Sequence, residues 1–218
     1  ATYSGTTATL QTAVKLSSTS SYQYHQLLCY DSHNKVFMCN HGSGSTSDFI
    51  NTFTVDSTGA ITNLAQVGLS GTYTYETTPA FAFDTTNNKF VMVFADSGNV
   101  LKCAIMGDGN AIAIAGTPTT INGTQQGSFK KKGLAYNPVY DNFIFVGSMT
   151  STDKLDYPPL TVNYSSNTVT AGSVVNINSN QWQFSSNNGN SGKLLVYTPT
   201  SKQYYFPAYP SSYSNSPK

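Results

Sequence analysis

The 218-residue chain carries a formal net charge of +1, with 10% of its residues charged and 39% hydrophobic. A hydrophobic fraction of this size can supply a core and argues against disorder, while the weak net charge argues against nucleic acid or an anionic membrane as a partner. All 11 basic residues are lysines, so the chain lacks the guanidinium group with which arginine makes bidentate hydrogen bonds to phosphates and guanine bases.

The composition favours short strands joined by polar turns, because Ser, Thr, Asn, Gly and Tyr are abundant. The first predicted elements are two polar strands, within "ATYSGTT" from Ala1 and "ATLQTAVKLSS" from Ala8. Four similar phrases follow, each made of an apolar strand, a polar turn and a second apolar strand. They are "LLCYDSHNKVFMC" from Leu27, "AFAFDTTNNKFVMVF" from Ala80, "GLAYNPVYDNFIFVG" from Gly133 and "LLVYTPTSKQYYFP" from Leu194.

These four phrases form an internal repeat. The aromatic residue that closes the first strand recurs at spacings of 53, 53 and 61 residues, and a period near 50 is typical of propellers and solenoids. Both strands of each phrase are apolar at nearly every position, as expected for strands buried on both faces. In the second repeat we predict four strands, at residues 80–83, 89–94, 100–106 and 111–121.

The fourth repeat stops after two strands, near Pro207, and the two N-terminal strands match the missing pair in length and turn chemistry. We therefore predict one all-β domain over residues 1–218, a four-bladed β-propeller with repeats of about 53–61 residues. Its last blade is split between residues 1–18 and 192–210, a closure that protects the sheet edges. The alternative is part of a larger propeller, and the missing initiator Met suggests a processed chain or a piece of a longer one.

The three cysteines, Cys29, Cys39 and Cys103, lack the paired spacing of a zinc site or a disulfide framework. Buried free thiols are the expected state, with a bridge between Cys29 and Cys39 across one hairpin as the alternative. We expect no metal and no cofactor. No apolar run approaches the roughly 18 residues of a membrane span, so no membrane insertion is expected.

Two longer stretches carry a family resemblance. The segments "PAFAFDTTNNKFVMVFADSGN" from Pro79 and "AIMGDGNAIAIAGTPTTIN" from Ala104 resemble the propeller-type repeats of tail-fibre and other virion surface proteins of bacteriophages. The resemblance extends over almost the whole chain, and it implies a propeller more firmly than any activity. The chain departs from the pattern at "NPVYDN" from Asn137 and in long insertions of the third and fourth repeats. The resemblance assigns a function to no individual residue.

In a propeller, the loops that join one blade to the next lie on the same face as the loops between the second and third strands. Here these loops are long and variable, whereas the turns of the opposite face are short and uniform, so function is expected on the variable face. The inter-blade loops hold aromatic side chains beside amides and hydroxyls, which suit the C–H faces and hydroxyl groups of sugars. These candidate ligand-binding residues are Tyr22, Tyr24, Tyr73, Tyr75, Phe129, Trp182 and Phe184.

The loops between second and third strands add further polar and aromatic residues to this predicted face. They are His41, Asp48, Asp153, Tyr157, Tyr209 and Tyr213. Two other interpretations of the loop aromatics stay open, because aromatic side chains also anchor protein interfaces and also plug or pack the interior of a fold.

A catalytic role would need an acid–base or nucleophile pair on the loop face. Glu76 with Asp153 or Asp48 is the best pairing that the sequence offers, and it would make a glycoside hydrolase only if the carboxyl groups lay about 5–9.5 Å apart. No GxSxG, HExxH or phosphate-loop motif occurs. We therefore predict a protein that is not an enzyme.

The combined features favour a structural protein of the phage virion surface, of tail-fibre type. We expect it to bind a host surface glycan or another virion protein, to lie on the virion surface or outside the cell, and to be able to form a homo-oligomer. The alternatives are a free secreted lectin and, with less support, a glycoside hydrolase.

Overall fold

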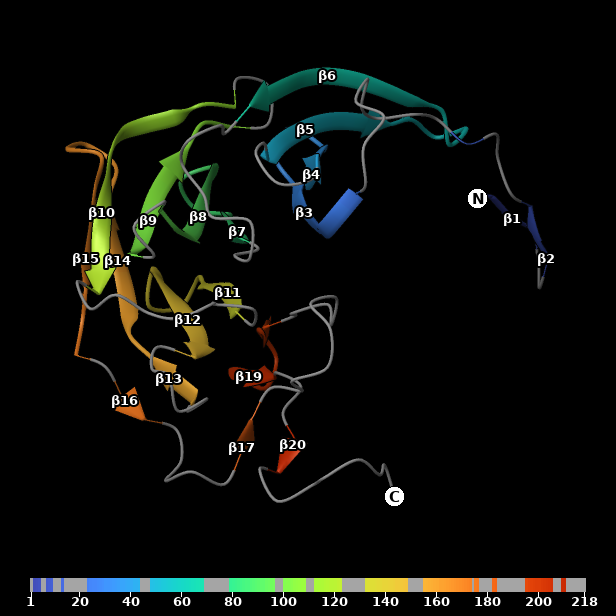
Figure 1. Ribbon diagram of the computed structural model, residues 1–218. Helices are drawn as coiled ribbons and strands as arrows, with labels where there is room; N and C mark the ends of the chain where they lie inside the picture. The colour runs from blue at the N-terminus through green and yellow to red at the C-terminus, as the bar shows by residue number, and fades with distance from the viewer. Residues whose placement is uncertain are drawn as a thin grey trace.

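A computed structural model of the chain confirms the all-β class, since every regular element in the described residues is a β-strand (Figure 1). All pairings between these strands are antiparallel. The structure describes residues 2–4, 7–9, 13, 23–43, 48–68, 79–96, 100–108, 112–122, 132–148, 155–173, 175–176, 182–183, 195–205 and 209–210.

Two sheets show the predicted four-strand repeat directly, with consecutive strands side by side. Sheet 1 consists of β3 (Gln23–Asp31), β4 (Val36–Ser43), β5 (Asp48–Val55) and β6 (Ile61–Gly68). Sheet 2 consists of β7 (Ala80–Asp84), β8 (Lys89–Ala95), β9 (Leu101–Met106) and β10 (Ile114–Asn122). The strands predicted for the second repeat agree with β7–β10 to within three residues at each end.

The third repeat follows the same plan, with its outer strands broken in two. Sheet 3 consists of β11 (Lys132–Asn137), β12 (Asn142–Ser148), β13 (Leu155–Tyr157), β14 (Pro159–Asn163), β15 (Thr168–Ala171) and β16 (Val175–Asn176). Both β13 and β14 pair with β12, and Pro158 separates them. Because proline has no N–H to donate to a neighbouring strand, it breaks the strand at this point.

The remaining strands form three short hairpins or pairs. Sheet 4 is the hairpin of β18 (Val196–Thr198) and β19 (Gln203–Tyr205). The other two pairs are β1 (Thr2–Ser4) with β2 (Thr7–Thr9), and β17 (Trp182–Gln183) with β20 (Tyr209–Pro210).

The turn after the first strand of each sheet has the same backbone geometry. In sheet 1, Oδ1 of Asp31 accepts hydrogen bonds from the backbone N–H groups of His33 and Asn34, both at 2.9 Å. Sheets 2 and 3 repeat this arrangement at Asp84 and Asn137. The fifth turn residue has a positive φ in all four sheets: Lys35 (58°), Asn88 (55°), Asp141 (48°) and Lys202 (54°). A left-handed residue at one fixed position shows that the sequence repeat is also a backbone repeat.

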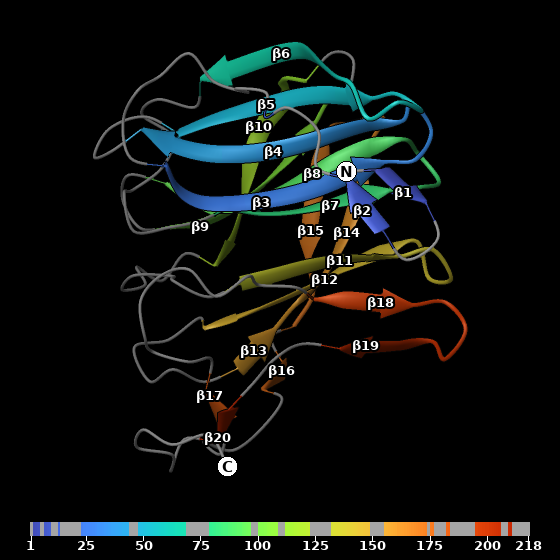
Figure 2. The same cartoon turned by 90° about the vertical axis from the view of Figure 1, so that its right-hand side faces the viewer.

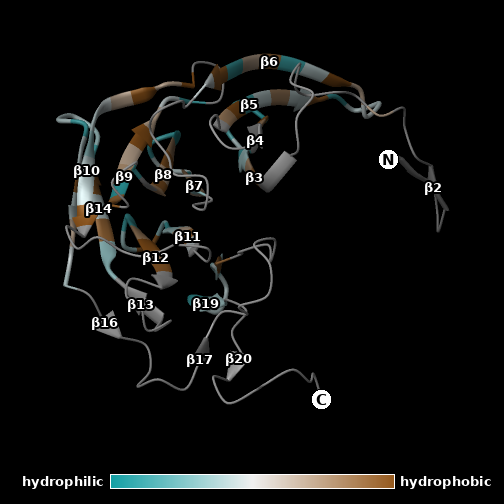
Figure 3. Cartoon of the chain, in the orientation of Figure 1, coloured by the Kyte–Doolittle hydropathy of each residue, from teal (hydrophilic) through white to brown (hydrophobic). Residues whose placement is uncertain are grey.

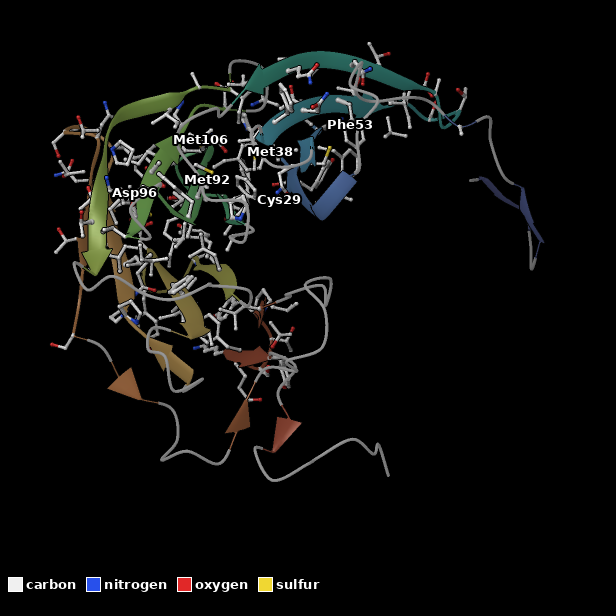
Figure 4. All side chains as sticks on the ribbon, in the orientation of Figure 1. Cys29, Met38, Phe53, Met92, Asp96 and Met106 are labelled. Atoms are coloured by element: carbon white, nitrogen blue, oxygen red, sulfur yellow. The ribbon has the colours of Figure 1, made fainter. Side chains whose placement is uncertain are left out.

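The core lies between consecutive sheets, as Figure 3 indicates by the brown colour of much of β9 and β12. Met38 of sheet 1 packs with Met92 and Met106 of sheet 2, and Figure 4 shows these side chains between the two sheets. A larger cluster joins sheets 2 and 3, and a smaller one joins sheets 3 and 4. Sheet 2 is therefore covered on both faces, which explains the unbroken apolar runs of its strands.

All three cysteines are free thiols. In sheet 1, Cys29 lies opposite Met38 on the neighbouring strand, while Cys39 lies opposite Leu28. Successive side chains of a strand point to opposite faces, so Cys29 and Cys39 lie on different faces of the sheet. The alternative of a bridge across this hairpin is wrong for this geometric reason, and Cys103 is fully buried in sheet 2.

The structure does not test the split fourth blade of residues 1–18 with 192–210 as a whole, because many of its residues lie outside the described ranges. Within the described residues, β1 pairs with β2 and β18 pairs with β19, and no strand pairing joins the two hairpins. Figure 1 places β1 and β2 well apart from β19. Strands of three residues with sequences such as "TYS" and "TAT" offer few apolar side chains to hold them against a sheet. Closure of the ring stays a prediction.

Candidate functional site

A cavity of about 740 Å³ lies where the first strands of the four sheets meet. Figure 2 shows β3 and β7 at about the same height, with β11 and then β18 below them. Each contributes the same part of the repeat, namely the end of the apolar strand and the start of the turn. The lining residues include Leu28, Tyr30, Phe81, Phe83, Leu134, Tyr136, Leu195 and Tyr197.

The cavity is apolar in character. Among the described residues that line it, none carries a charged side chain, and its polar groups are hydroxyls and a thiol, such as those of Ser32 and Cys29. Its wall on sheet 1 is open, because Leu28 is 61% exposed and Tyr30 is 43% exposed. A site of this kind can pack apolar groups, but it offers no acid–base pair for catalysis.

The cysteine thiols are poor nucleophiles in this setting. Burial raises the pKa of Cys29 to about 12, and the hydrogen bonds to the backbone of Tyr30 and Phe83 only partly oppose that effect. Burial also raises the pKa of Cys103. Since the thiolate is the reactive form, both residues are expected to act as small apolar side chains.

The buried carboxylate of Asp84 accepts hydrogen bonds from its own turn. Asp84 is 1% exposed, and its Oδ1 accepts hydrogen bonds from the backbone N–H groups of Thr86 and Asn87, at 2.8 and 2.9 Å. Its Oδ2 accepts from the side-chain amide of Asn87 at 3.0 Å and from the hydroxyl of Tyr164 at 2.5 Å. These contacts hold the turn and join sheet 2 to sheet 3, so Asp84 is a structural residue.

A second tyrosine joins the same two sheets. The hydroxyl oxygen of Tyr136 lies 2.6 Å from Oγ1 of Thr86 in sheet 2 and 2.8 Å from Oδ1 of Asp141 in its own turn. Burial raises the pKa of Tyr136 and that of Tyr164, and nearby carboxylates add to the rise at both residues. Both phenols are therefore neutral hydrogen-bonding groups at ordinary pH.

Most of the predicted ligand-binding residues lie outside the described residues. These are Tyr22, Tyr73, Tyr75, Phe129 and Phe184, together with the candidate catalytic residues Glu76 and Asp153. For the two others, Tyr24 and Trp182, the structure describes the backbone. The predicted aromatic site is therefore untested as a whole. Only the backbone pairings of Tyr24 and Trp182 can be compared with the prediction.

The described backbone brings some of the predicted segments together. Trp182 on β17 lies opposite Pro210 on β20, and the next pair along is Gln183 with Tyr209. The loop before β18 thus runs beside the segment that follows β19, and both were predicted for the variable face. In sheet 1, Tyr24 and Asp48 both lie opposite Gly42, on either side of β4.

The cavity was missed at the sequence level. Its lining residues are the apolar first strands themselves, which were interpreted as strands buried between neighbouring sheets. The signal that could have found it is the repeat position, because four equivalent strands that each begin a blade must surround one common centre.

No group of three or more His, Cys, Asp or Glu side chains is placed to hold a metal ion in the part of the chain that the structure describes. Among those same residues, no helix has the length and apolar character to cross a membrane.

Comparison with known proteins finds a likeness to a solved structure. No protein-family model and no curated protein matches the chain. The chain is similar to a crystal structure of TolB from Acinetobacter baumannii, with a TM-score of 0.38 and 12% sequence identity. The match covers 69% of this chain and 32% of the TolB chain, so it spans about a third of that protein.

Proposed function

We propose that sheets 1 to 4 are the blades of a four-bladed β-propeller and that the protein is a non-enzymatic component of a phage virion surface. Its variable loop face binds a host glycan. The repeat resemblance supports the virion assignment, and the cavity lined by the first strand of every sheet supports the ring. The occupied turn carboxylates and the uncharged cavity support a binding role over a catalytic one.

One observation carries the choice of the loop face. The strand pair β17–β20 places the segment of Trp182 beside that of Tyr209, although 27 residues separate them in sequence. Figure 2 shows β17 and β20 on the left of the molecule, away from the β11–β12 and β18–β19 turns on the right. The backbone thus brings together two segments that each carry an aromatic residue, and aromatic rings suit the C–H faces of sugars.

The test is a glycan array with the chain and two matched variants. Trp182→Ala removes the aromatic side chain from the proposed face, and we expect binding to fall by roughly 30-fold, the equivalent of about 2 kcal/mol for a central aromatic contact. Tyr140→Ala is the control, because Tyr140 is 73% exposed on the turn after β11. Its loss should leave binding unchanged.

Three outcomes would contradict parts of this proposal. If the chain binds no glycan but incorporates stably into particles, its partner is another virion protein. Shortening of a host polysaccharide by the chain, abolished by Glu76→Gln, would make it a glycoside hydrolase. Glycan binding by a protein that is absent from purified particles would make it a free lectin.

A further inference from the structure

Each sheet has two unlike faces. We define the aromatic face as the one that carries Tyr30 in sheet 1 and the equivalent Phe83, Tyr136 and Tyr197 in the other sheets. The small-residue face carries Cys29 and the equivalent Ala82, Ala135 and Val196. The two sets alternate along the first strand, so they point to opposite sides of their sheets.

The same contact between unlike faces occurs three times in the molecule. The aromatic face of sheet 2 packs on the face of sheet 1 that carries Cys29. In the same way, Tyr136 of sheet 3 packs with Ala82 of sheet 2, and Tyr197 of sheet 4 packs with Ala135 of sheet 3. A single rule therefore holds: the aromatic face of each sheet covers the small-residue face of the preceding sheet.

This rule leaves two faces without a partner sheet, namely the aromatic face of sheet 1 and the small-residue face of sheet 4. On the aromatic face of sheet 1, Leu28 is 61% exposed and Tyr30 is 43% exposed, while Tyr136 at the equivalent position of sheet 3 is 7% exposed. Phe37 continues this face as a half-buried ring, with its centroid 4.6 Å from that of Tyr30. Phe53 on β5 belongs to the same face and is only 7% exposed, so the exposed part of this face is the side of β3 that carries Leu28 and Tyr30. Exposed apolar side chains of this size are costly to leave in water.

The other uncovered face belongs to sheet 4. Val196 is 45% exposed and Tyr205 is 53% exposed. At the equivalent positions of sheets 2 and 3, Ala82 and Ala135 are each 6% exposed and Val91 is 0% exposed, while Ile144 is half-buried. The two uncovered faces are thus of the unlike kinds that pack together everywhere else in the chain.

We infer that the small-residue face of sheet 4 packs on the aromatic face of sheet 1 in the folded protein, which closes the ring at a seam. The seam is defined by Leu28, Tyr30, Val196 and Tyr205. The inference rests on the four-bladed ring proposed above, but it does not depend on glycan binding. It specifies which two faces meet where the ring closes and which side chains are buried between them.

The repeat also predicts a polar contact at the seam. Tyr136 of sheet 3 has its hydroxyl 2.6 Å from Thr86, the third residue of the preceding sheet's first turn. Tyr30 occupies the place of Tyr136, and the third residue of the corresponding turn in sheet 4 is Thr200. The hydroxyls of Tyr30 and Thr200 are therefore expected to bond to each other in the closed ring.

The seam can be tested on the unmodified chain by hydroxyl-radical labelling of tyrosines, read by mass spectrometry. Tyr136 and Tyr140, with exposed fractions of 7% and 73%, serve as internal standards. We expect Tyr30 and Tyr205 to react about as slowly as Tyr136, several-fold more slowly than Tyr140. Labelling of both at the rate of Tyr140 would overturn the seam. If Tyr136 also reacted fast, the proposed ring itself would be wrong.

A charge placed in the seam sharpens the test. Val196→Asp should raise the labelling of Tyr30 to a rate close to that of Tyr140, because the carboxylate cannot be buried against an apolar face. Val139→Asp is the matched control, since Val139 is 50% exposed on the turn after β11, and it should leave Tyr30 protected. Protection of Tyr30 that appears only with a dimeric mass in light scattering would instead assign the face to a second copy.

Discussion

Sheets 2 and 4 contain the same repeated phrase, but their surroundings differ. Phe90 in sheet 2 is 0% exposed, whereas the equivalent Tyr204 in sheet 4 is half-buried. Both form an aromatic pair with their first strand at a centroid distance of 5.0 Å. The local structure is therefore the same, and what differs is how completely the preceding sheet covers each ring. An apolar phrase predicts a hairpin, but its neighbours decide how much stability that hairpin contributes.

The largest expected effect comes from removing the ring of Phe90. Phe90→Ala should lower the free energy of unfolding by about 3–5 kcal/mol, because a fully buried ring leaves a cavity that its neighbours cannot fill. Tyr204→Ala changes the equivalent position of sheet 4 and should cost clearly less. Urea denaturation followed by fluorescence measures both values. Equal losses would show that sheet 4 is as well covered as sheet 2.

The strands and turns of these sheets could be predicted from the sequence because each depends on neighbouring residues. Asp84 and Asn88 specify the turn after β7 by a side-chain acceptor and a left-handed backbone, and both effects are local. The burial of a sheet face by a neighbouring sheet depends on residues that are distant in sequence. Tyr30 and Tyr136 share one repeat position but differ in exposure, at 43% and 7%, and only the arrangement of whole sheets explains the difference.

The candidate site was less predictable for a related reason. Its aromatic residues were chosen by loop position, and a loop position specifies neither the direction of a side chain nor its partners. The pairing of Trp182 with Pro210 could not be foreseen, because it joins two segments that belong to different repeats. The cavity could be foreseen only by treating the four first strands as one ring.

A second variant tests how firmly sheet 4 is held by sheet 3. A methyl group added at Gly133 would lie 2.7 Å from Cβ of Leu195 and 3.0 Å from its backbone nitrogen, which is closer than packing allows. Gly133→Ala should therefore cost about 1–3 kcal/mol and should increase the radical labelling of Tyr204, as sheet 4 is displaced from the face of sheet 3 on which it packs. Gly68→Ala is the control, because its methyl group would meet the ring of Phe49 at an ordinary 3.6 Å. Unchanged labelling of Tyr204 would mean that sheet 4 is held by contacts other than this face.

The smallest effect expected is at the polar contact that joins sheet 2 to sheet 3. Tyr164→Phe removes the hydroxyl that donates to Oδ2 of Asp84 at 2.5 Å, and we expect a loss of about 1–2 kcal/mol at neutral pH. Tyr140→Phe is the control, because Tyr140 is 73% exposed on the turn after β11. That change should be close to neutral.

The same variant should also alter the response to alkaline pH. Burial and the Asp84 carboxylate raise the pKa of Tyr164 above its usual 10, so the folded state holds this proton more tightly than the unfolded chain does. The stabilising contribution is fully present below pH 10 and is lost as the pH rises from 10 toward the raised pKa, because the unfolded chain ionises first. The urea midpoint of the unmodified chain should therefore fall above pH 10. In Tyr164→Phe it should fall less steeply, with Tyr136 accounting for part of the remaining slope. A midpoint that falls equally in both proteins would show that the bond between Tyr164 and Asp84 does not hold sheets 2 and 3 together.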